Sequence, residues 1–302
     1  MDQKIIDLYD EFTHGTMSRR RFFDRLAVLA GGTAAASALL PLLQSNYALA
    51  QTVAESDARI TTETIAIAGV DKLNGYLVTP KAPGRAPAVI VIHENRGLTP
   101  HIKDVTRRLG AEGFTALGVD FLSPLGGTPT DEDQARTMIG QLKQDDVVAC
   151  SRAALAALKS HPRANGKVGA VGFCWGGGQV NALAVAGPTL DAAVPYYGRQ
   201  PAAESVASIR APLLLHYAGN DEPINAGIPA YEAALKAAGK SYELYIYPNV
   251  QHAFNNDTGA ARYNKEAADL AWSRTLAFFR KNLGETIRSW RKFPLRSHRG
   301  RS

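Results

Sequence analysis

The sequence has little cysteine and lacks the common cofactor-binding loops. Only Cys150 and Cys174 occur in 302 residues, which excludes a disulfide scaffold and a cysteine-rich zinc or iron–sulfur site. No G-x-x-x-x-G-K-[ST] phosphate-binding loop is present, and the glycines at positions 176–178 are too closely spaced for a dinucleotide-binding fingerprint. We therefore expect no cofactor.

Histidines at metal-ligand spacing are also lacking. His93-Glu94 begins like the helix of a zinc protease, but Gly97 stands where the second histidine would be needed, and the segment ends a predicted strand. The remaining histidines of the central region, such as His101 and His216, form no spaced cluster. The sequence predicts no metal site.

An excess of positive charge is confined to one end of the chain. The formal net charge is +6, but residues 1–50 carry five basic and five acidic side chains, and residues 284–302 carry six basic side chains against one acidic. The region between them is therefore close to neutral, which argues against a nucleic-acid partner. We expect the basic tail, residues 284–302, to be disordered.

No apolar run is long and continuous enough for a clear membrane span. The apolar, uncharged run at residues 26–43 is at the lower length limit and is interrupted by Gly31, Gly32 and Pro41. Paired arginines in the segment Ser18–Phe23 precede it, and Ala48–Ala50 follows it with the small–x–small pattern of a signal-peptidase site.

Residues 1–50 thus resemble a twin-arginine export signal. This predicts recognition by the twin-arginine export machinery, cleavage near Ala50, and a periplasmic or secreted mature protein with no stable membrane span. An uncleaved membrane anchor and a soluble amphipathic helix are the alternatives.

The region 51–283 alternates β-rich runs with helical patterns and contains no internal repeat or long linker. Such alternation predicts a single α/β domain with a mostly parallel central sheet and helices on both faces. An antiparallel opening pair is expected at Thr62–Ala68 and Asn74–Thr79. The later expected strands are Ala86–His93, Phe114–Val119, Lys167–Phe173, Ala192–Tyr197, Pro212–Ala218 and Tyr242–Tyr247. Helices are expected at Pro100–Glu112, within residues 131–160, and at Ala267–Phe279.

A nucleophile elbow follows one of these strands. Gly172–Gly176 reads G-x-C-x-G, where small residues permit a sharp strand-to-helix turn that presents Cys174. The helix N-terminus beneath the sulfur favours a thiolate. A buried structural cysteine is the alternative. A disulfide with Cys150 would abolish the nucleophile, and we do not expect one.

Two later strand ends carry the side chains that a cysteine nucleophile needs. Asp221 follows the strand Pro212–Ala218, and His252 follows the strand Tyr242–Tyr247. This order of nucleophile, acid and base is that of an α/β-hydrolase triad, in which Asp221 would orient the imidazole and His252 would carry the proton.

These motifs together resemble the dienelactone hydrolase family of the α/β-hydrolase fold. The resemblance implies that Glu94, at the end of an early core strand, contacts the resting thiol and helps to take its proton. It also assigns an oxyanion hole to the backbone N–H groups of Asn95 and Trp175. From the residues alone, Glu94 could equally form a salt bridge with Arg96 or Lys103. Arg96, Tyr196 and Tyr197 are candidate substrate contacts, although paired aromatics at a strand end are more often core residues.

The leading functional hypothesis is a hydrolase of lactones or small carboxylic esters that works through a cysteine acyl-enzyme. A thioesterase or peptidase-like acyl hydrolase would share the triad, and a non-enzymatic exported binding protein could keep the fold. Family members that hold a substrate carboxylate use two arginines, and Pro124 and Asn256 stand at those places here. We therefore expect a neutral small-molecule ester or lactone to be preferred over an anionic one.

Overall fold

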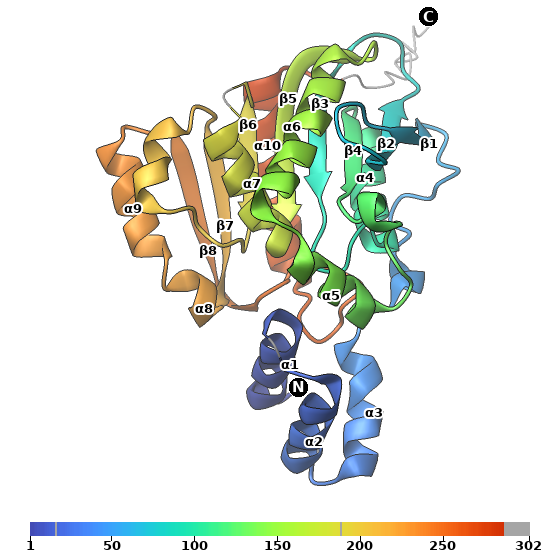
Figure 1. The fold of residues 1–302 in the computed structure, drawn as a ribbon, viewed down its shortest axis with the longest axis vertical. Helices are drawn as coiled ribbons and strands as arrows, with labels where there is room; N and C mark the ends of the chain where they lie inside the picture. The colour runs from blue at the N-terminus through green and yellow to red at the C-terminus, as the bar shows by residue number, and fades with distance from the viewer. Residues whose placement is uncertain (16, 188, 287–302) are drawn as a thin grey trace, which may run out of the picture.

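The computed structural model describes residues 1–15, 17–187 and 189–286, and most of the chain in it is built around one mixed sheet (Figure 1). Among the described residues, eight strands pair in the order β1-β2-β4-β3-β5-β6-β7-β8. The pairs β1–β2 and β2–β4 are antiparallel, and all later pairs are parallel. The strands are β1 (Ile60–Ala66), β2 (Asn74–Pro80), β3 (Ala86–Ile92), β4 (Thr115–Asp120), β5 (Ala164–Phe173), β6 (Ala192–Tyr196), β7 (Leu213–Asn220) and β8 (Tyr242–Gln251).

The central strand β3 is buried along its whole length because both faces of the sheet are covered. Val89 and Val91 point into the apolar cluster on one face, and Ala88, Ile90 and Ile92 point into the cluster on the other. This alternation follows from the two-residue period of a strand. The continuous apolar run in the sequence is thus a strand buried on both sides, as predicted.

Helices cover both faces of the sheet. The first face is covered by α4 (Pro100–Ala111) and α10 (Lys265–Leu283), and the second by α6 (Gln144–Ser160), α7 (Trp175–Ala186) and α9 (Ile228–Ala237). The short helices α5 (Glu132–Gln141) and α8 (Glu222–Asn225) lie in connections after β4 and β7. The predicted α/β architecture is confirmed, although α8 and α9 were not expected from the sequence.

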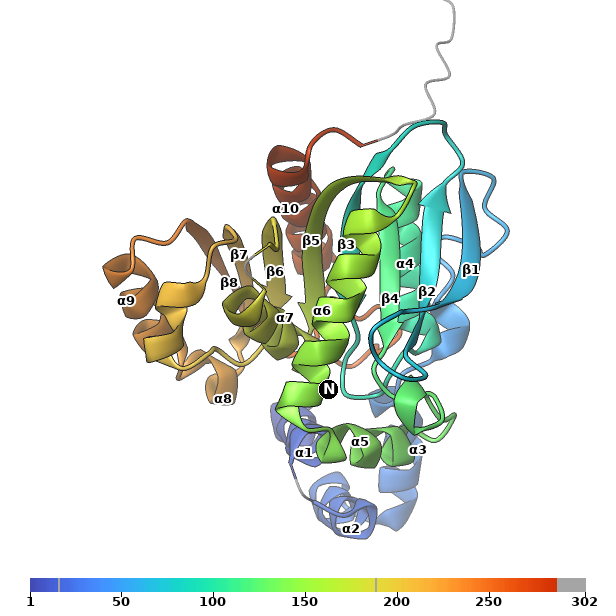
Figure 2. The ribbon, with the colours of Figure 1, turned by 45° about the horizontal axis from the view of Figure 1, so that its top comes forward.

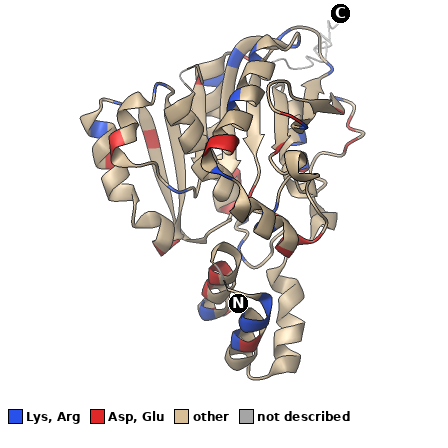
Figure 3. Ribbon diagram, viewed as in Figure 1, with Lys and Arg blue, Asp and Glu red and all other residues tan. Residues whose placement is uncertain are grey.

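The first fifty residues form a helical unit with its own apolar core. Its helices are α1 (Gln3–His14), α2 (Arg19–Ala30) and α3 (Thr33–Leu43), which Figures 1 and 2 place together at one end of the sheet, beside α5. Charged side chains lie on α1 and α2 and are absent from α3 (Figure 3). The buried side chains at its centre include Tyr9, Phe12, Phe22, Leu26 and Leu43.

Within the described residues, no single helix has the length and apolar character needed to cross a membrane. The stretches Arg19–Ala30 and Thr33–Leu49 meet that requirement only when they are taken together, and they are bent by 112° at their break. Gly31 and Gly32 occupy this break with positive φ angles of 81° and 146°, a backbone region that favours glycine.

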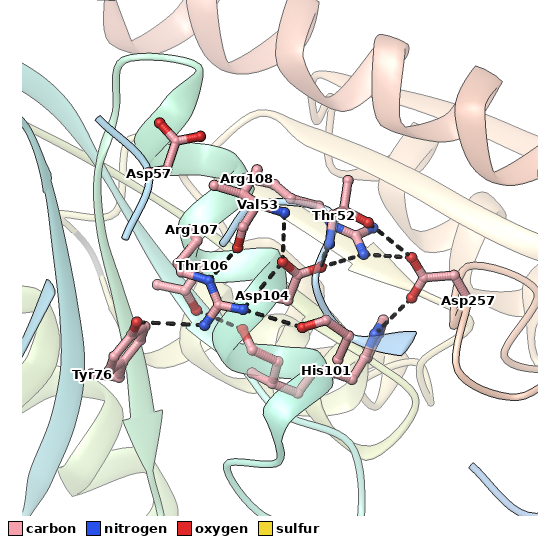
Figure 4. A network of polar contacts seen from close by, with 12 residues as sticks. Thr52, Val53, Asp57, Tyr76, His101, Asp104, Thr106, Arg107, Arg108 and Asp257 are labelled. Carbon is pink, nitrogen blue, oxygen red and sulfur yellow. Dashed lines mark hydrogen bonds and ion pairs between the residues drawn. The ribbon is translucent and has the colours of Figure 1, made fainter. Parts of the chain in front are cut away.

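We call residues 51–283, which contain the sheet and its covering helices, the body. A buried polar network fixes the chain just after the N-terminal unit to this body (Figure 4). The carboxylate of Asp104 on α4 is fully buried and accepts hydrogen bonds from the backbone N–H of Val53 at 2.9 Å and from Nε of Arg108 at 2.9 Å. Arg108 also pairs with Asp257, whose other oxygen lies 3.1 Å from Nδ1 of His101. The network therefore joins three distant segments of the chain.

The basic tail falls almost entirely outside the described residues. Of residues 284–302, the structure describes only positions 284–286, which follow the end of α10. The expectation of a disordered tail therefore stays a prediction.

Candidate active site

Cys174 sits on a strained turn between β5 and α7. Its φ and ψ angles are 57° and −117°, and it precedes the first residue of α7. An added Cβ at Gly172 would lie 2.3 Å from the carbonyl oxygen of Gly176, and one at Gly176 would lie 2.4 Å from that of His93. The glycines are therefore required by close backbone contacts, and the turn has the geometry of a nucleophile elbow.

Asp221 and His252 come together because β7 and β8 are parallel neighbours. Both residues are buried at the carboxyl ends of these strands, and Nδ1 of His252 lies 2.6 Å from Oδ2 of Asp221. Since the carboxylate accepts the Nδ1 proton, Nε2 of His252 carries the free lone pair in the neutral ring. This Nε2 is buried and has no hydrogen-bond partner among the described residues.

The charge environment favours the protonated form of His252. Burial opposes a charged imidazole, but the carboxylate of Asp221 and the sulfur of Cys174 outweigh it and hold the pKa of His252 well above its ordinary value. An imidazole that readily holds a proton can receive one from a thiol, which suits His252 for the role of a general base.

The sulfur of Cys174 contacts a histidine that the sequence analysis did not single out. Nε2 of His14, the last residue of α1, lies 3.2 Å from Sγ of Cys174. The rings of His14 and His252 are also close, with centroids 4.4 Å apart. Both cysteines of the chain are free, so the thiol is available for chemistry.

Glu94 lies at the end of β3 but is held by another partner. Its Oε2 accepts a hydrogen bond of 2.8 Å from Nδ2 of Asn256, and no bond joins it to Cys174 among the described residues. The resemblance had implied a contact between Glu94 and the resting thiol. In this structure His14 occupies the hydrogen-bonding position at the sulfur instead.

The two backbone groups assigned to an oxyanion hole are free of backbone and side-chain acceptors in the described part of the chain. Trp175 is the first residue of α7, so its N–H has no partner within the helix. The N–H of Asn95 likewise makes no hydrogen bond there. The side chain of Asn95 donates to the carbonyl of Thr13 at 2.7 Å, which places α1 directly over this loop.

The three candidate substrate contacts occupy different surroundings. Arg96 is buried beside Glu132, 3.5 Å away, and lines a cavity of about 610 Å³ between the N-terminal helices and the body. Tyr196 is a core residue whose hydroxyl bonds to Thr275 at 2.7 Å. Tyr197 packs against His252 with a ring-centroid distance of 4.9 Å, and its buried hydroxyl has no partner among the described residues. Tyr197 is thus the one of the three whose side chain is shown to pack against His252, whereas Tyr196 contacts Cys174 through its backbone carbonyl, which accepts from the Cys174 N–H at 3.1 Å.

The missed residue, His14, had an indirect signal in the sequence. The apolar side chains of α1 recur at helical spacing, from Ile5 to Phe12, and all of them are buried. An amphipathic helix of this kind packs against a protein surface. The periodicity could therefore have predicted that α1 docks, although not that it docks on Cys174.

Comparison with known proteins places the body in one family. The model of the "Dienelactone hydrolase family" matches residues 73–283. A "Putative carboxymethylenebutenolidase" of Saccharolobus solfataricus is 34% identical over 246 residues, which cover 70% of this chain and 94% of the relative. A "Probable 2-oxo-3-(5-oxofuran-2-ylidene)propanoate lactonase" of Bradyrhizobium is 33% identical over 244 residues, with 74% of this chain and 98% of the relative covered.

Solved structures and a second family model add to this result. The crystal structure of a "Putative Dienelactone Hydrolase" from Klebsiella pneumoniae superposes with a TM-score of 0.67 at 29% identity, and covers 73% of this chain and 98% of that one. Residues 1–31 match a separate model described as "YqhI-like". That match spans the whole of α1 and α2, two of the helices that lie outside the hydrolase match.

Proposed function

Because this chain belongs to the dienelactone hydrolase family, we propose that it hydrolyses lactones or small carboxylic esters through an acyl-enzyme formed on Cys174. The observation that carries the proposal is the meeting of Cys174, on its strained elbow, with the buried Asp221–His252 pair. These side chains come from three strand ends and have the roles of nucleophile, orienting acid and base.

The first half of the reaction transfers the acyl group to sulfur. His252 takes the thiol proton, and the sulfur attacks the carbonyl carbon of the substrate to form a tetrahedral intermediate. The N–H groups of Trp175 and Asn95 stabilise its negative oxygen. When the carbon–oxygen bond breaks, the leaving alkoxide receives the proton from His252. In a lactone that alcohol stays attached to the acyl group.

The second half of the reaction regenerates the thiol. A water molecule gives a proton to His252 and attacks the thioester carbon, and the sulfur leaves with the proton that His252 returns. Asp221 holds the imidazole in one tautomer throughout and stabilises its charged form. We assign Glu94 an assisting role at the thiol, which requires that its carboxylate exchange Asn256 for the sulfur.

The position of α1 sets a condition on this mechanism. Since Nε2 of His14 lies 3.2 Å from the sulfur, a substrate carbonyl can reach Cys174 only when His14 has moved away. The ion pair of 2.6 Å between Asp10 and Arg262 and the hydrogen bond from Asn95 to Thr13 must rearrange with it. Access to the site is therefore coupled to the N-terminal helices.

We further propose that residues 1–50 are a twin-arginine export signal and that the mature protein is periplasmic or secreted. The support is the order of the paired arginines, the uncharged α3 and the pattern Ala48–Ala50. In the folded chain the carbonyl of Ala50 accepts a hydrogen bond of 3.2 Å from Arg107. Cleavage after Ala50 therefore requires this segment to detach from α4.

A thioesterase or peptidase-like acyl hydrolase would use the same three residues. No contact in the described structure favours a thioester or a peptide over an ester, so a panel of substrates must discriminate between them. A non-enzymatic binding role is not favoured, because the family is one of hydrolases and the acid–base pair is assembled.

The test is turnover of a chromogenic short-chain ester by purified variants. Cys174→Ala should abolish turnover, and Cys174→Ser should keep a small part of it because the elbow and His252 remain. Cys150→Ala is the matched control, since it removes the other thiol from α6 and should leave turnover unchanged. Undiminished turnover by Cys174→Ala would overturn the proposal.

A further inference from the structure

Three strong metal-ligand atoms meet at the mouth of the proposed site. The ring nitrogens of His14 and His252 and the sulfur of Cys174 all lie within 4.8 Å of one another. We propose that the full-length chain binds one Zn²⁺-class cation between these three side chains. The proposal goes beyond ester hydrolysis, because it adds a residue from the N-terminal helix and a ligand that the hydrolytic reaction does not use.

The distances suit a single small cation. Zn²⁺ binds nitrogen at about 2.0–2.1 Å and sulfur at about 2.3 Å, so two donors of one tetrahedral ion lie roughly 3.3–3.6 Å apart. The distance from Nε2 of His14 to Sγ of Cys174 is already 3.2 Å. The ligand atom of His252 lies within 4.8 Å of the other two donor atoms. A side-chain movement on the order of 1 Å would therefore bring it to the separation that a tetrahedral ion requires.

In their neutral forms, both imidazoles present a lone pair to the centre of this group. Nδ1 of His14 lies 3.0 Å from the carbonyl oxygen of Asp10, which can only accept, so Nδ1 carries the proton and Nε2 is free. In His252 the carboxylate of Asp221 binds the Nδ1 proton in the same way. Metal-bound histidines commonly have such a carbonyl or carboxylate on the second ring nitrogen, because it fixes the ring and raises its basicity.

The burial of His252 is a second feature that suits a cation at this place. Nε2 of His252 is buried and has no hydrogen-bond partner in the described structure. A buried polar atom without a partner is unfavourable, and a cation that displaces the Nε2 proton would satisfy it. His14 itself is exposed, whereas Cys174 and His252 are buried.

The chemistry of the donor set favours Zn²⁺. Two imidazole nitrogens and one thiolate are borderline-soft ligands, and three protein ligands with one open position are typical of non-structural zinc sites. On binding, the thiol of Cys174 loses its proton to solvent and the sulfur–metal bond takes its place. A sulfur held in this way cannot attack an ester, so the ion would keep the full-length chain inactive.

The third ligand is held in place by contacts of α1 with the body. Asp10 pairs with Arg262 at 2.6 Å, and the carbonyl of Thr13 accepts from Asn95 at 2.7 Å. The carbonyl of Phe12 accepts from Arg136, whose guanidinium also stacks on the Phe12 ring at 4.1 Å. These contacts flank His14 and restrict its position, as a preorganised ligand requires.

The decisive experiment measures metal binding by the full chain without any substrate. Zn²⁺ is titrated in competition with a chromophoric chelator into the wild-type chain, His14→Ala and the matched control His161→Ala, whose histidine ends α6. We expect one bound ion in the wild type and in the control, and an affinity at least tenfold lower in His14→Ala, because even outer partners of metal ligands change affinity by about 10–100-fold. Equal affinity of His14→Ala and the wild type, or no binding by either, would overturn the proposal.

A spectroscopic readout identifies the sulfur. In the Cys150→Ser chain, Cys174 is the only cysteine, and Co²⁺ should produce a near-ultraviolet thiolate-to-cobalt band that Cys150→Ser/Cys174→Ser lacks. Circular dichroism and a thermal melt confirm that each variant is folded. Because neither readout involves turnover, zinc binding by a chain whose metal-free form has no esterase activity would contradict only the proposed function. Esterase activity without binding would contradict only the metal site.

Discussion

The pair formed by Asp221 and His252 is the residue-scale feature on which the proposed catalysis depends most. Each side chain is about 6% exposed, and the short Nδ1–Oδ2 distance of 2.6 Å leaves no room for water between them. A buried carboxylate in this position fixes the imidazole tautomer and supports its charged form. Its removal should therefore affect catalysis far more than folding.

We predict that Asp221→Asn lowers kcat for a short-chain ester by about 10⁴-fold, the effect of the corresponding change in a serine-protease triad. The amide can donate to Nδ1 and so stabilise the wrong tautomer, with Nε2 protonated. Steady-state kinetics check this result. Glu222→Gln, the exposed neighbouring carboxylate, is the control and should keep wild-type kcat. A fall of less than tenfold in Asp221→Asn would exclude Asp221 as the orienting acid.

Substrate charge is a second residue-scale question. Asn256 gives its amide to Glu94, Arg262 pairs with Asp10 at 2.6 Å, and Arg96 lies beside Glu132. In the full-length chain, Arg262 and Arg96 thus already face a carboxylate. We predict that a neutral short ester has a kcat/KM about tenfold or more above that of its carboxylate-bearing analogue, since one charged hydrogen bond is worth roughly 1.5–3 kcal/mol. A strong preference for the anionic member would show that Arg262 has exchanged Asp10 for substrate.

The residues of the proposed triad could be identified from the sequence because each of them follows a recognisable strand. Gly172 and Gly176 mark the elbow, and Asp221 and His252 end apolar runs. His14 could not be located in this way. Its contact with Cys174 spans 160 positions and depends on how α1 docks, which no local pattern specifies.

At the scale of elements, the network between α4 and the segment before α10 anchors the chain around the sheet. Its carboxylate Asp257 is buried in part. Burial alone would raise its pKa, but His101 and Arg108 outweigh that effect and lower the pKa from 3.8 to about 2. A carboxylate whose pKa is lower in the folded chain than in the unfolded chain stabilises the fold at pH values above its unfolded-state pKa. This stabilisation is lost as the pH falls through the folded-state pKa.

We predict that Asp257→Asn lowers the free energy of unfolding at pH 7 by about 2 kcal/mol, on the scale of 1.36 kcal/mol per pKa unit. The difference from wild type should shrink between about pH 4 and pH 2, where the wild-type carboxylate becomes protonated. Urea unfolding at several pH values measures it. Asp269→Asn, an exposed carboxylate on α10, should change stability by less than about 0.5 kcal/mol. Equal effects of the two changes would contradict the assigned role of Asp257.

The predicted elements of the body agree with the structure because their apolar periods are regular. Ala86–Ile92 alternates between two apolar clusters, and Pro100–Ala111 begins with a capping Thr99 and a proline in its first turn. The helix Ile228–Ala237 escaped prediction. Its N-cap residue, Gly227, makes no side-chain capping hydrogen bond. Its many alanines also give little contrast between an apolar and a polar face, so the sequence pattern that would reveal this helix is weak.

At the scale of the whole molecule, the N-terminal unit is both the predicted export signal and a cover over Cys174. Arg19 lies at the start of α2, is exposed, and pairs with Asp133 at 2.8 Å, while Arg20 lines the cavity beside it. Exposed pairs of this kind are weak and exchange readily. The paired arginines could therefore leave the body to meet a receptor without disturbing the hydrolase fold.

We predict that Arg19→Lys combined with Arg20→Lys retains the protein in the cytoplasm with its first fifty residues uncut. The export receptor reads the arginine pair, and lysine preserves the charge but not the planar guanidinium. Cell fractionation and immunoblotting measure the outcome. Arg25→Lys, on the same helix, is the control and should leave delivery unchanged. Normal delivery of the double variant would refute the twin-arginine assignment.

The central claim is that Cys174 carries the acyl group, and trapping that group tests it most directly. The Cys150→Ser chain, in which Cys174 is the only thiol, is mixed with a slowly hydrolysed ester, quenched in acid during turnover and analysed by mass spectrometry. We predict a mass increase equal to the acyl group, located on the peptide that contains Cys174 and absent after Cys174→Ala. Steady turnover by Cys174→Ala, with no acyl group on Cys174 in the parent chain at saturating ester, would contradict the account.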